Sequence, residues 1–241
     1  MVCCLNGIKL NWQNSRPQLP VISTDRPGFS DSSSLVPSGM FQIESGFFRT
    51  QVGSQTTTSF GDLALRYGLS NQFELRIGEI SYGFSPTSNQ WLNPYLGFKA
   101  RIIRKPIEVT LIGQSTIPMG SGQFQESSWE PTAILAWSAP SGVNSFGGNF
   151  DWIGQGSGQT QFSQLGASLW FSHPISKSTA LTYELSALNQ TSFQGSGSAY
   201  VSIAITHLLT NQTQLDLRIG TGMNSKKDGW LLQGGYSILF Q

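Results

Sequence analysis

This chain of 241 residues contains few charged residues. Asp, Glu, Lys and Arg together make up 11% of the sequence, whereas a soluble domain carries about 25%. The formal net charge is +1 and no block of basic residues occurs, so a nucleic-acid partner is not expected. Seven Trp, six Tyr and fifteen Phe nevertheless argue against a disordered chain. The composition describes a folded protein that avoids charge.

Long hydrophobic runs and spaced cysteines are missing as well. No segment approaches the roughly 18 to 20 apolar residues of a membrane-spanning helix, which excludes an α-helical span. Cys3 and Cys4 are adjacent, and this spacing suits neither a disulfide framework nor a zinc site. Residues 1–10 lack the basic start and the longer apolar core of an export signal. If the chain is exported, we expect its signal to be encoded upstream of Met1 or to have been removed.

The regular feature of the sequence is an alternation of apolar and polar residues from Met40 onward. In the segment 72–79, Phe73, Leu75 and Ile77 alternate with polar neighbours, as in a strand with two unlike faces. No segment of comparable length has a convincing helical period, so the pattern predicts an all-β chain. Twelve strands are expected, over residues 40–50, 60–68, 72–79, 93–103, 106–115, 130–138, 145–152, 162–171, 178–187, 198–207, 213–221 and 230–240.

Alternation alone fits two folds, because a soluble sandwich turns its apolar face inward and a membrane barrel turns it toward lipid. Short connections that alternate with longer ones, and an even number of strands, favour the barrel. Aromatic residues also gather at strand ends, as in the two interfacial girdles of a membrane barrel. Those near the short connections are Phe41, Tyr67, Phe73, Trp137, Phe146, Phe171 and Phe240, and those near the longer ones are Phe60, Trp91, Trp129, Trp152, Phe162 and Trp230.

The expected fold is a single transmembrane antiparallel β-barrel of about twelve strands over residues 39–241. Its periplasmic turns are short, and its longer extracellular loops are expected near residues 51–59, 80–92, 116–129, 153–161, 188–197 and 222–229. Residues 1–38 precede it as an N-terminal periplasmic lead-in segment. The last strand carries Trp230, Tyr236 and Phe240 in one phase, which resembles the aromatic-ended strand that barrel assembly machinery recognises. The expected partners are therefore outer-membrane lipid, this machinery and a small-molecule solute.

The opposite phase of the strands carries most of the charge and is expected to line the lumen. Two interpretations stay open: a structural ion network that fills a narrow interior, and the polar lining of a pore. Burying such groups unpaired is costly, so we expect Arg66 and Arg76 to form an internal ion-pair cluster with Glu44, Glu74 and Glu108. The lumen-lining residues expected from the phase are Glu44, Asp62, Arg66, Glu74, Arg76, Lys99, Arg101, Glu108, Asp151, Glu184, Asp216 and Arg218.

Catalytic and metal-binding patterns are not found in the sequence. A barrel hydrolase would need a serine and a histidine together on the outer wall, beside an oxyanion site. The two histidines, His173 and His207, fall instead at the short-turn rim and lack such neighbours. No group of His, Asp and Glu has the spacing of metal ligands. The sequence therefore predicts no enzyme, no catalytic residue, no metal and no cofactor.

The N-terminal part of the chain resembles a known family. Thr24-Asp25-Arg26-Pro27, followed by Pro37-x-Gly39-x-x-Gln42-x-Glu44-x-Gly46, is similar to the opening of the phenol meta-pathway transporters, a family of Gram-negative outer-membrane proteins. Residues 65–78 resemble the second hairpin of that family, and Gly97-Phe98-Lys99 resembles its usual Gly-x-Lys strand. The resemblance covers residues 20–120 well, whereas the later strands share only the general pattern of barrel strands.

The resemblance implies an outer-membrane barrel for transport or passive permeation of small molecules, hydrophobic or aromatic ones among them. The alternative is a non-conducting structural barrel whose lumen is plugged by its own side chains. A twelve-stranded barrel lies between packed barrels of about eight strands and open ones of about sixteen, so size alone does not decide. The element Thr24, Asp25, Arg26 and Pro27 is expected to fold into the periplasmic mouth, where Asp25 or Arg26 pairs with lumen charges. It either helps to close the barrel or acts as a gate.

Overall fold

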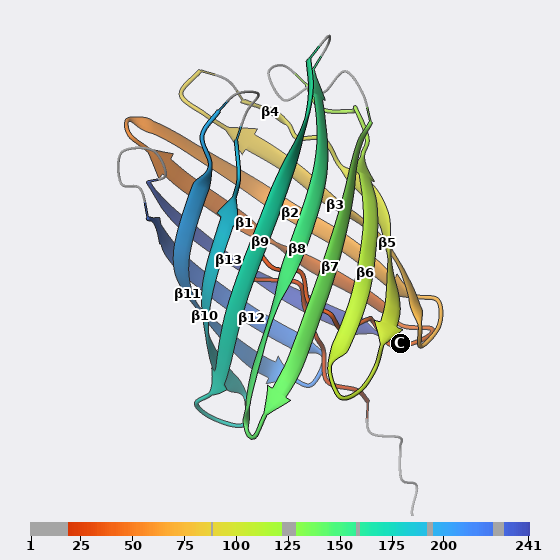
Figure 1. Cartoon of the computed structure of the whole chain (residues 1–241). Coiled ribbons are helices and arrows are strands. Elements are labelled where there is room, and N and C mark those ends of the chain that lie inside the picture. The colour runs from red at the N-terminus through yellow and green to blue at the C-terminus, as the bar shows by residue number, and fades with distance from the viewer. Residues whose placement is uncertain (1–18, 88, 122–128, 158–159, 192–194, 224–228) are drawn as a thin grey trace, which may run out of the picture.

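The computed structural model describes residues 19–87, 89–121, 129–157, 160–191, 195–223 and 229–241. Its strands form one antiparallel sheet that closes on itself, because β1 pairs with both β2 and β13 (Figure 1). The strands are β1 Phe41–Val52, β2 Gln55–Gly68, β3 Phe73–Phe84, β4 Asn89–Trp91, β5 Tyr95–Ile103, β6 Glu108–Thr116, β7 Glu130–Ser141, β8 Asn144–Ser157, β9 Thr160–Pro174, β10 Thr179–Leu188, β11 Ser198–Thr210, β12 Thr213–Gly222 and β13 Trp230–Phe240. In this described part of the chain, no helix is long and apolar enough to cross a membrane.

The predicted all-β barrel is confirmed, since twelve strands form the closed wall and each predicted segment overlaps one of them. Two predicted long connections were wrong. β1 ends at Val52 and β2 begins at Gln55, while β8 ends at Ser157 and β9 begins at Thr160. Residues 55–59 are all polar, so they show no apolar alternation by which a strand could be recognised. The short β4, which extends the sheet at the end of β3, was missed because three residues show no period.

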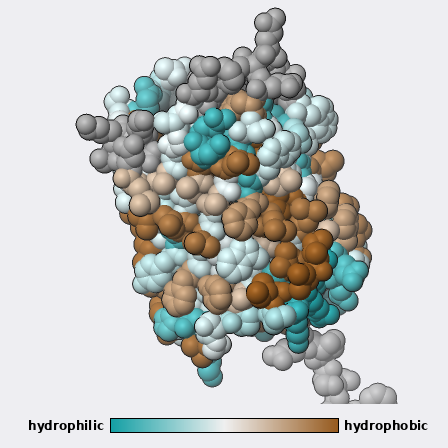
Figure 2. Space-filling view, viewed as in Figure 1, coloured by the Kyte–Doolittle hydropathy of each residue, from teal (hydrophilic) through white to brown (hydrophobic). Residues whose placement is uncertain are grey.

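The outer wall carries the apolar phase of the strands. Leu75, Tyr183 and Leu217 belong to regular strands, yet they are 43%, 49% and 48% exposed. Figure 2 shows hydrophobic side chains gathered around the middle of the wall and hydrophilic ones toward both ends. A closed sheet pairs its backbone groups internally, and this apolar band can therefore face lipid. Exposed aromatic side chains are Phe60, Tyr67, Phe84, Trp91, Trp129, Phe146, Phe150, Trp152, Phe171, Tyr183, Tyr236 and Phe240.

Residues 19–40 are here called the inner segment; its ends are exposed, and the part between them runs inside the barrel (Figure 1). At the short-turn end, the Ile22 N–H donates to the Asn211 carbonyl at 2.8 Å. After its passage through the lumen the segment returns to the same end, where Ser38 forms an isolated bridge with Gly68. A small apolar core of Ile22, Val36, Met40 and Leu239 packs there. The lead-in is therefore a loop of main chain that reaches from one mouth deep into the lumen.

Candidate functional site

Arg66 lies at the centre of the largest ion-pair cluster in the lumen. It comes from β2, and Glu44 and Glu74 occupy inward positions of the neighbouring strands β1 and β3. Arg66 Nη1 lies 2.7 Å from Glu44 Oε1, and Arg66 Nε lies 2.7 Å from Glu74 Oε1. All three side chains are fully buried. Two carboxylates around one guanidinium compensate the cost of removing these charges from water.

The inner segment adds its own carboxylates to this cluster. Asp25 Oδ1 accepts a hydrogen bond from Lys99 Nζ at 2.6 Å, and Asp25 Oδ2 lies 3.3 Å from both Arg66 Nη1 and Arg76 Nη2. Asp31 Oδ1 lies 2.8 Å from Arg76 Nη1. Burial alone would raise the pKa of Asp25, but the positive charges of Arg66, Lys99 and Arg76 lower it well below its ordinary value. The segment is thus joined to the wall through a carboxylate that stays ionised.

Arg26 anchors the segment to the seam between β1 and β13. Its Nη2 donates to the Gly234 carbonyl at 2.9 Å, and its Nε and Nη1 lie 3.5 Å and 3.8 Å from Asp216 and Asp62. The wall residues that face the Arg26 guanidinium, Gly46 and Gly235, have no side chains. A Cβ atom on Gly46 of β1 would collide with the Arg26 guanidinium, so glycine makes room for it.

Glu184 of β10 holds the segment on the other side of the lumen. Its carboxylate accepts hydrogen bonds from the Phe29 N–H, the Ser30 N–H and the Ser30 hydroxyl, at 2.7–3.1 Å. Arg218 Nη2 of β12 lies 2.6 Å from the same carboxylate. Ser30 Oγ also lies 2.7 Å from Ser168 Oγ of β9. Residues 25–31 therefore cross the lumen and are held at both walls.

Beyond Asp31 the segment runs along β2, β3, β6 and β7. The Val36 N–H donates to Glu74 Oε2 at 2.7 Å, so Glu74 binds both Arg66 and the main chain of the segment. The hydroxyls of Ser33 and Ser34 lie 3.4 Å and 3.2 Å from Glu108 Oε2. Charged groups of the wall thus replace the sheet partners that this extended chain lacks.

All twelve residues expected in the lumen lie at inward-facing positions. Asp62, Arg101 and Glu108 are half-buried. The others are buried, namely Glu44, Arg66, Glu74, Arg76, Lys99, Asp151, Glu184, Asp216 and Arg218. Their grouping differs in part from the expected single cluster.

Glu108 does not join the cluster around Arg66. It pairs with Arg101 at 2.8 Å near the short turns, because β5 separates its strand from β3. Arg76 binds Asp25 and Asp31 of the inner segment, which the strand pattern could not supply. Asp151 forms none of the ion pairs found within the described residues.

Sequence reasoning did not single out Tyr95, Ser30 or Asp31. Tyr95 has the same strand phase as Lys99, and its hydroxyl accepts a hydrogen bond from Arg76 Nη2 at 2.7 Å. The phase alone could have identified it. Ser30 and Asp31 belong to a segment without a periodic pattern, so no local signal indicates which wall they contact.

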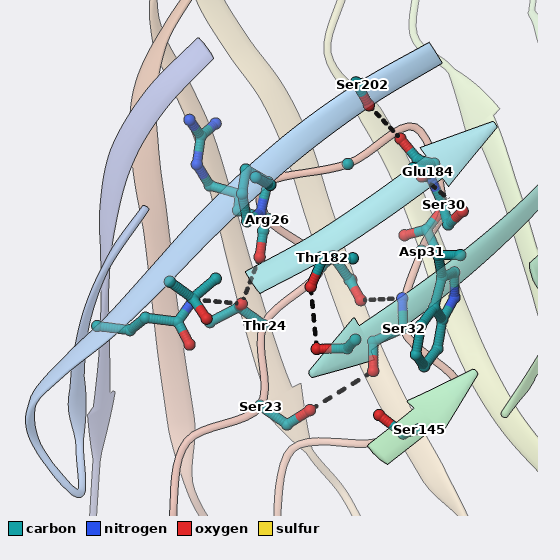
Figure 3. Close-up of a pocket in the computed structure, with 18 of the residues that line it drawn as sticks. Ser23, Thr24, Arg26, Ser30, Asp31, Ser32, Ser145, Thr182, Glu184 and Ser202 are labelled. Atoms are coloured by element: carbon teal, nitrogen blue, oxygen red, sulfur yellow. Dashed lines mark hydrogen bonds between the residues drawn. The ribbon is translucent and has the colours of Figure 1, made fainter. Parts of the chain in front are cut away.

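Cavities remain on both sides of the inner segment. The short-turn cavity, of about 250 Å³, lies between the segment and strands β8 to β12 (Figure 3). The long-loop cavity, of about 340 Å³, lies on the other side of the segment, mainly against β1, β2, β3 and β5. Both are lined by Asp25, Arg26, Gly28, Ser30 and Asp31, so these residues separate them. A smaller apolar cavity of about 160 Å³ is lined in part by Phe29, Phe48, Leu188, Tyr200 and Leu231.

A metal site is not formed by the described side chains. Among them, no group of three or more His, Cys, Asp or Glu residues is placed to hold an ion.

A closed twelve-stranded sheet with an apolar outer wall and a charged interior defines an outer-membrane β-barrel. Residues 24–240 match the family model described as "Putative MetA-pathway of phenol degradation", and the chain belongs to that family. The match includes the inner segment from Thr24 onward together with the barrel, and it confirms the resemblance seen in the sequence.

Solved structures of the same fold are outer-membrane channels and porins. The COG4313 outer membrane channel from Pseudomonas putida F1 is 14% identical with a TM-score of 0.67, over 89% of this chain and 99% of that one. The NanC porin is 8% identical with a TM-score of 0.58, over 83% and 99%. The KdgM porin in complex with disordered oligogalacturonate is 11% identical with a TM-score of 0.56, over 83% and 99%. No curated protein matches the sequence. The fold and these neighbours point to the outer membrane of Gram-negative bacteria.

Proposed function

We propose that the protein is an outer-membrane barrel through which small solutes pass beside the seated inner segment. The observation that carries this proposal is the pair of cavities, of about 250 and 340 Å³, on the two sides of residues 25–31. Passage beside the segment needs open space of this kind on both of its sides. The main chain crosses the lumen, and passage is therefore restricted to small molecules.

The solute class is inferred from the family and from the apolar cavity. The family model concerns phenol degradation. The apolar cavity beside Phe29, Phe48 and Tyr200 has the aromatic lining that a small hydrophobic ring would contact. Both observations support hydrophobic or aromatic molecules among the solutes.

A non-conducting structural barrel is the second candidate. It is favoured by the full burial of Arg66, Glu74 and Lys99, whose side chains fill part of the lumen between the inner segment and strands β2, β3 and β5. In that case the cavities hold only water, and the ion pairs serve stability alone. The plug would then consist of main chain as well as side chains.

Reconstitution of the full chain separates the two candidates. We expect a small but measurable KCl conductance in planar bilayers and swelling of proteoliposomes in small uncharged solutes. Vesicles without protein provide the baseline, and heat-modifiable migration on gels verifies that the barrel has folded. A folded, inserted barrel without conductance or swelling would contradict the proposal and establish the structural candidate.

A further inference from the structure

The short-turn cavity has a chemistry of its own, because hydroxyl groups line one of its walls. Ser145, Ser172 and Thr182 are cross-strand neighbours on β8, β9 and β10. Their inward side chains therefore form a row, in which Thr182 Oγ1 donates to Ser172 Oγ at 3.0 Å (Figure 3). Thr206 of β11 lines the same cavity. Each hydroxyl can both donate and accept, so this wall can replace water around an uncharged polar solute.

An aromatic surface lies in the next row of the same wall. Trp170 is the cross-strand neighbour of Gly147 on one side and of Glu184 on the other. Its indole ring lies across Gly147, where a Cβ atom would collide with it. Trp170 is half-buried and lines the cavity. The cavity thus combines a planar apolar surface with a row of hydroxyl groups.

The charged side chains at this cavity already have partners. Glu184 is paired with Arg218, and Asp25 is paired with Lys99. The other two charged lining residues are paired as well, Arg26 with Asp216 and Asp31 with Arg76. An ion that entered would give up hydration without gaining a free opposite charge, which is unfavourable.

We propose that the short-turn cavity binds an uncharged, hydroxyl-bearing ring of about the size of one monosaccharide. The row from Ser145 to Thr182 exchanges hydrogen bonds with the hydroxyls of the ring, and Trp170 contacts its apolar face. The volume of about 250 Å³ suits one ring rather than a chain of them. The inference rests on the proposed function in that it names a solute class for the same lumen, but binding can be measured without passage.

Binding is tested with glucose as the probe. The full chain, in a detergent without a sugar headgroup, is titrated with glucose while its tryptophan fluorescence is recorded. We expect a saturable change that is lost in Trp170→Leu and kept in Trp152→Leu, whose side chain is on the outer wall and 42% exposed. A change that does not saturate, or that survives in folded Trp170→Leu, overturns the proposal.

Selectivity is tested by proteoliposome swelling in glucose, glucuronate and glucosamine, which differ mainly in charge. Glucose should enter about tenfold faster than either charged sugar, because desolvation of an ion is not compensated in this cavity. Thr182→Val and Thr206→Val keep the side-chain shape and remove a hydroxyl. Each should lower the ratio of glucose entry to KCl conductance about threefold, because this is the effect expected from the loss of one hydrogen bond.

Thr221→Val, at the exposed long-loop rim, is the matched control and should keep this ratio. Equal entry of the three sugars, or an unchanged ratio in both cavity variants, overturns the inference while leaving solute passage intact. Saturable glucose binding in a barrel that conducts and admits nothing would instead refute the proposed function and support the site.

Discussion

At the scale of single residues, buried charge in this lumen depends on partners within reach. Arg66 contacts Glu44, Glu74 and Asp25, which belong to two strands and the inner segment. Arg76 and Lys99 add two further cations to the same group through Asp25. Such a network contributes little compared with an apolar core of equal volume, but the loss of one member leaves an uncompensated charge. Its members therefore stabilise the barrel as a set.

Glu74→Gln tests this dependence. The substitution keeps the shape of the side chain but leaves Arg66 with less compensating charge and weakens the bond to the Val36 N–H. The free energy of unfolding in urea should fall by about 3 kcal/mol. Glu108→Gln makes the same chemical change at a half-buried pair and should cost about 1 kcal/mol or less. Equal losses of unfolding free energy for the two variants would show that the buried cluster contributes no more to stability than the half-buried pair.

Asp25 gives the seated segment a dependence on pH. Its pKa is lowered in the folded chain, so its stabilising contribution is complete above its ordinary pKa of about 4 and is lost as the pH falls below that value. KCl conductance should therefore rise progressively as the pH falls from about 5 to below about 4, as the segment loosens. Bilayer recordings across this range measure it.

The matched variants are Asp25→Asn and Asp151→Asn. Asp25→Asn should raise conductance already at neutral pH and remove the rise in acid, because it imitates the protonated carboxyl. Asp151 is outside the ion pairs of the described residues, so its variant should keep the rise. An acid response of unchanged size in Asp25→Asn would assign the effect to other groups.

At the scale of elements, the alternation of each strand was enough to separate its two faces. The period of two places Glu74 in the lumen and Leu75 on the outer wall, as the structure shows. The twelve wall strands could be predicted for the same reason. The strand ends that extend beyond the apolar band could not be predicted. Consecutive residues there, such as Gln55 and Thr56, are polar and therefore show no alternation.

The course of the inner segment could not be predicted either. Its contacts with Glu44, Glu184 and Glu74 join residues that are far apart in the sequence, and each uses backbone N–H groups that any residue type supplies. The charges of Asp25 and Arg26 indicated only that the segment would meet opposite charge. Their partners depend on where the closed barrel places its inward groups.

Leu75→Arg tests the assignment of faces on β3. A cation in lipid near the midplane should lower the free energy of unfolding in vesicles by about 2 to 4 kcal/mol. Leu75→Phe keeps an apolar side chain on the same outer wall and should fold as well as the original. If Leu75→Arg were tolerated as well as Leu75→Phe, the band that contains Leu75 would not face lipid.

At the scale of the whole molecule, the groups that hold the inner segment differ between the two sides of the lumen. The cations that pair with carboxylates of the inner segment, Arg66, Arg76 and Lys99, come from β2, β3 and β5. On the opposite side, Glu184 of β10 accepts hydrogen bonds from the main chain of the segment. Strands β8 to β11 present mainly hydroxyl groups to the short-turn cavity. The proposed passage along strands β8 to β11 therefore runs beside a segment that is bound at both walls.

A cross-link between the segment and the wall distinguishes passage beside a seated segment from passage that needs its release. Ser30 Oγ and Ser168 Oγ lie 2.7 Å apart, so cysteines at these positions are close enough for a disulfide. In a Cys3→Ser, Cys4→Ser background, the oxidised Ser30→Cys, Ser168→Cys barrel should admit small uncharged solutes as fast as the reduced one. Oxidation should also abolish the rise of conductance in acid, which verifies that the segment is held. Entry that stops on oxidation and returns with reductant would show that the segment must leave its seat for solutes to pass.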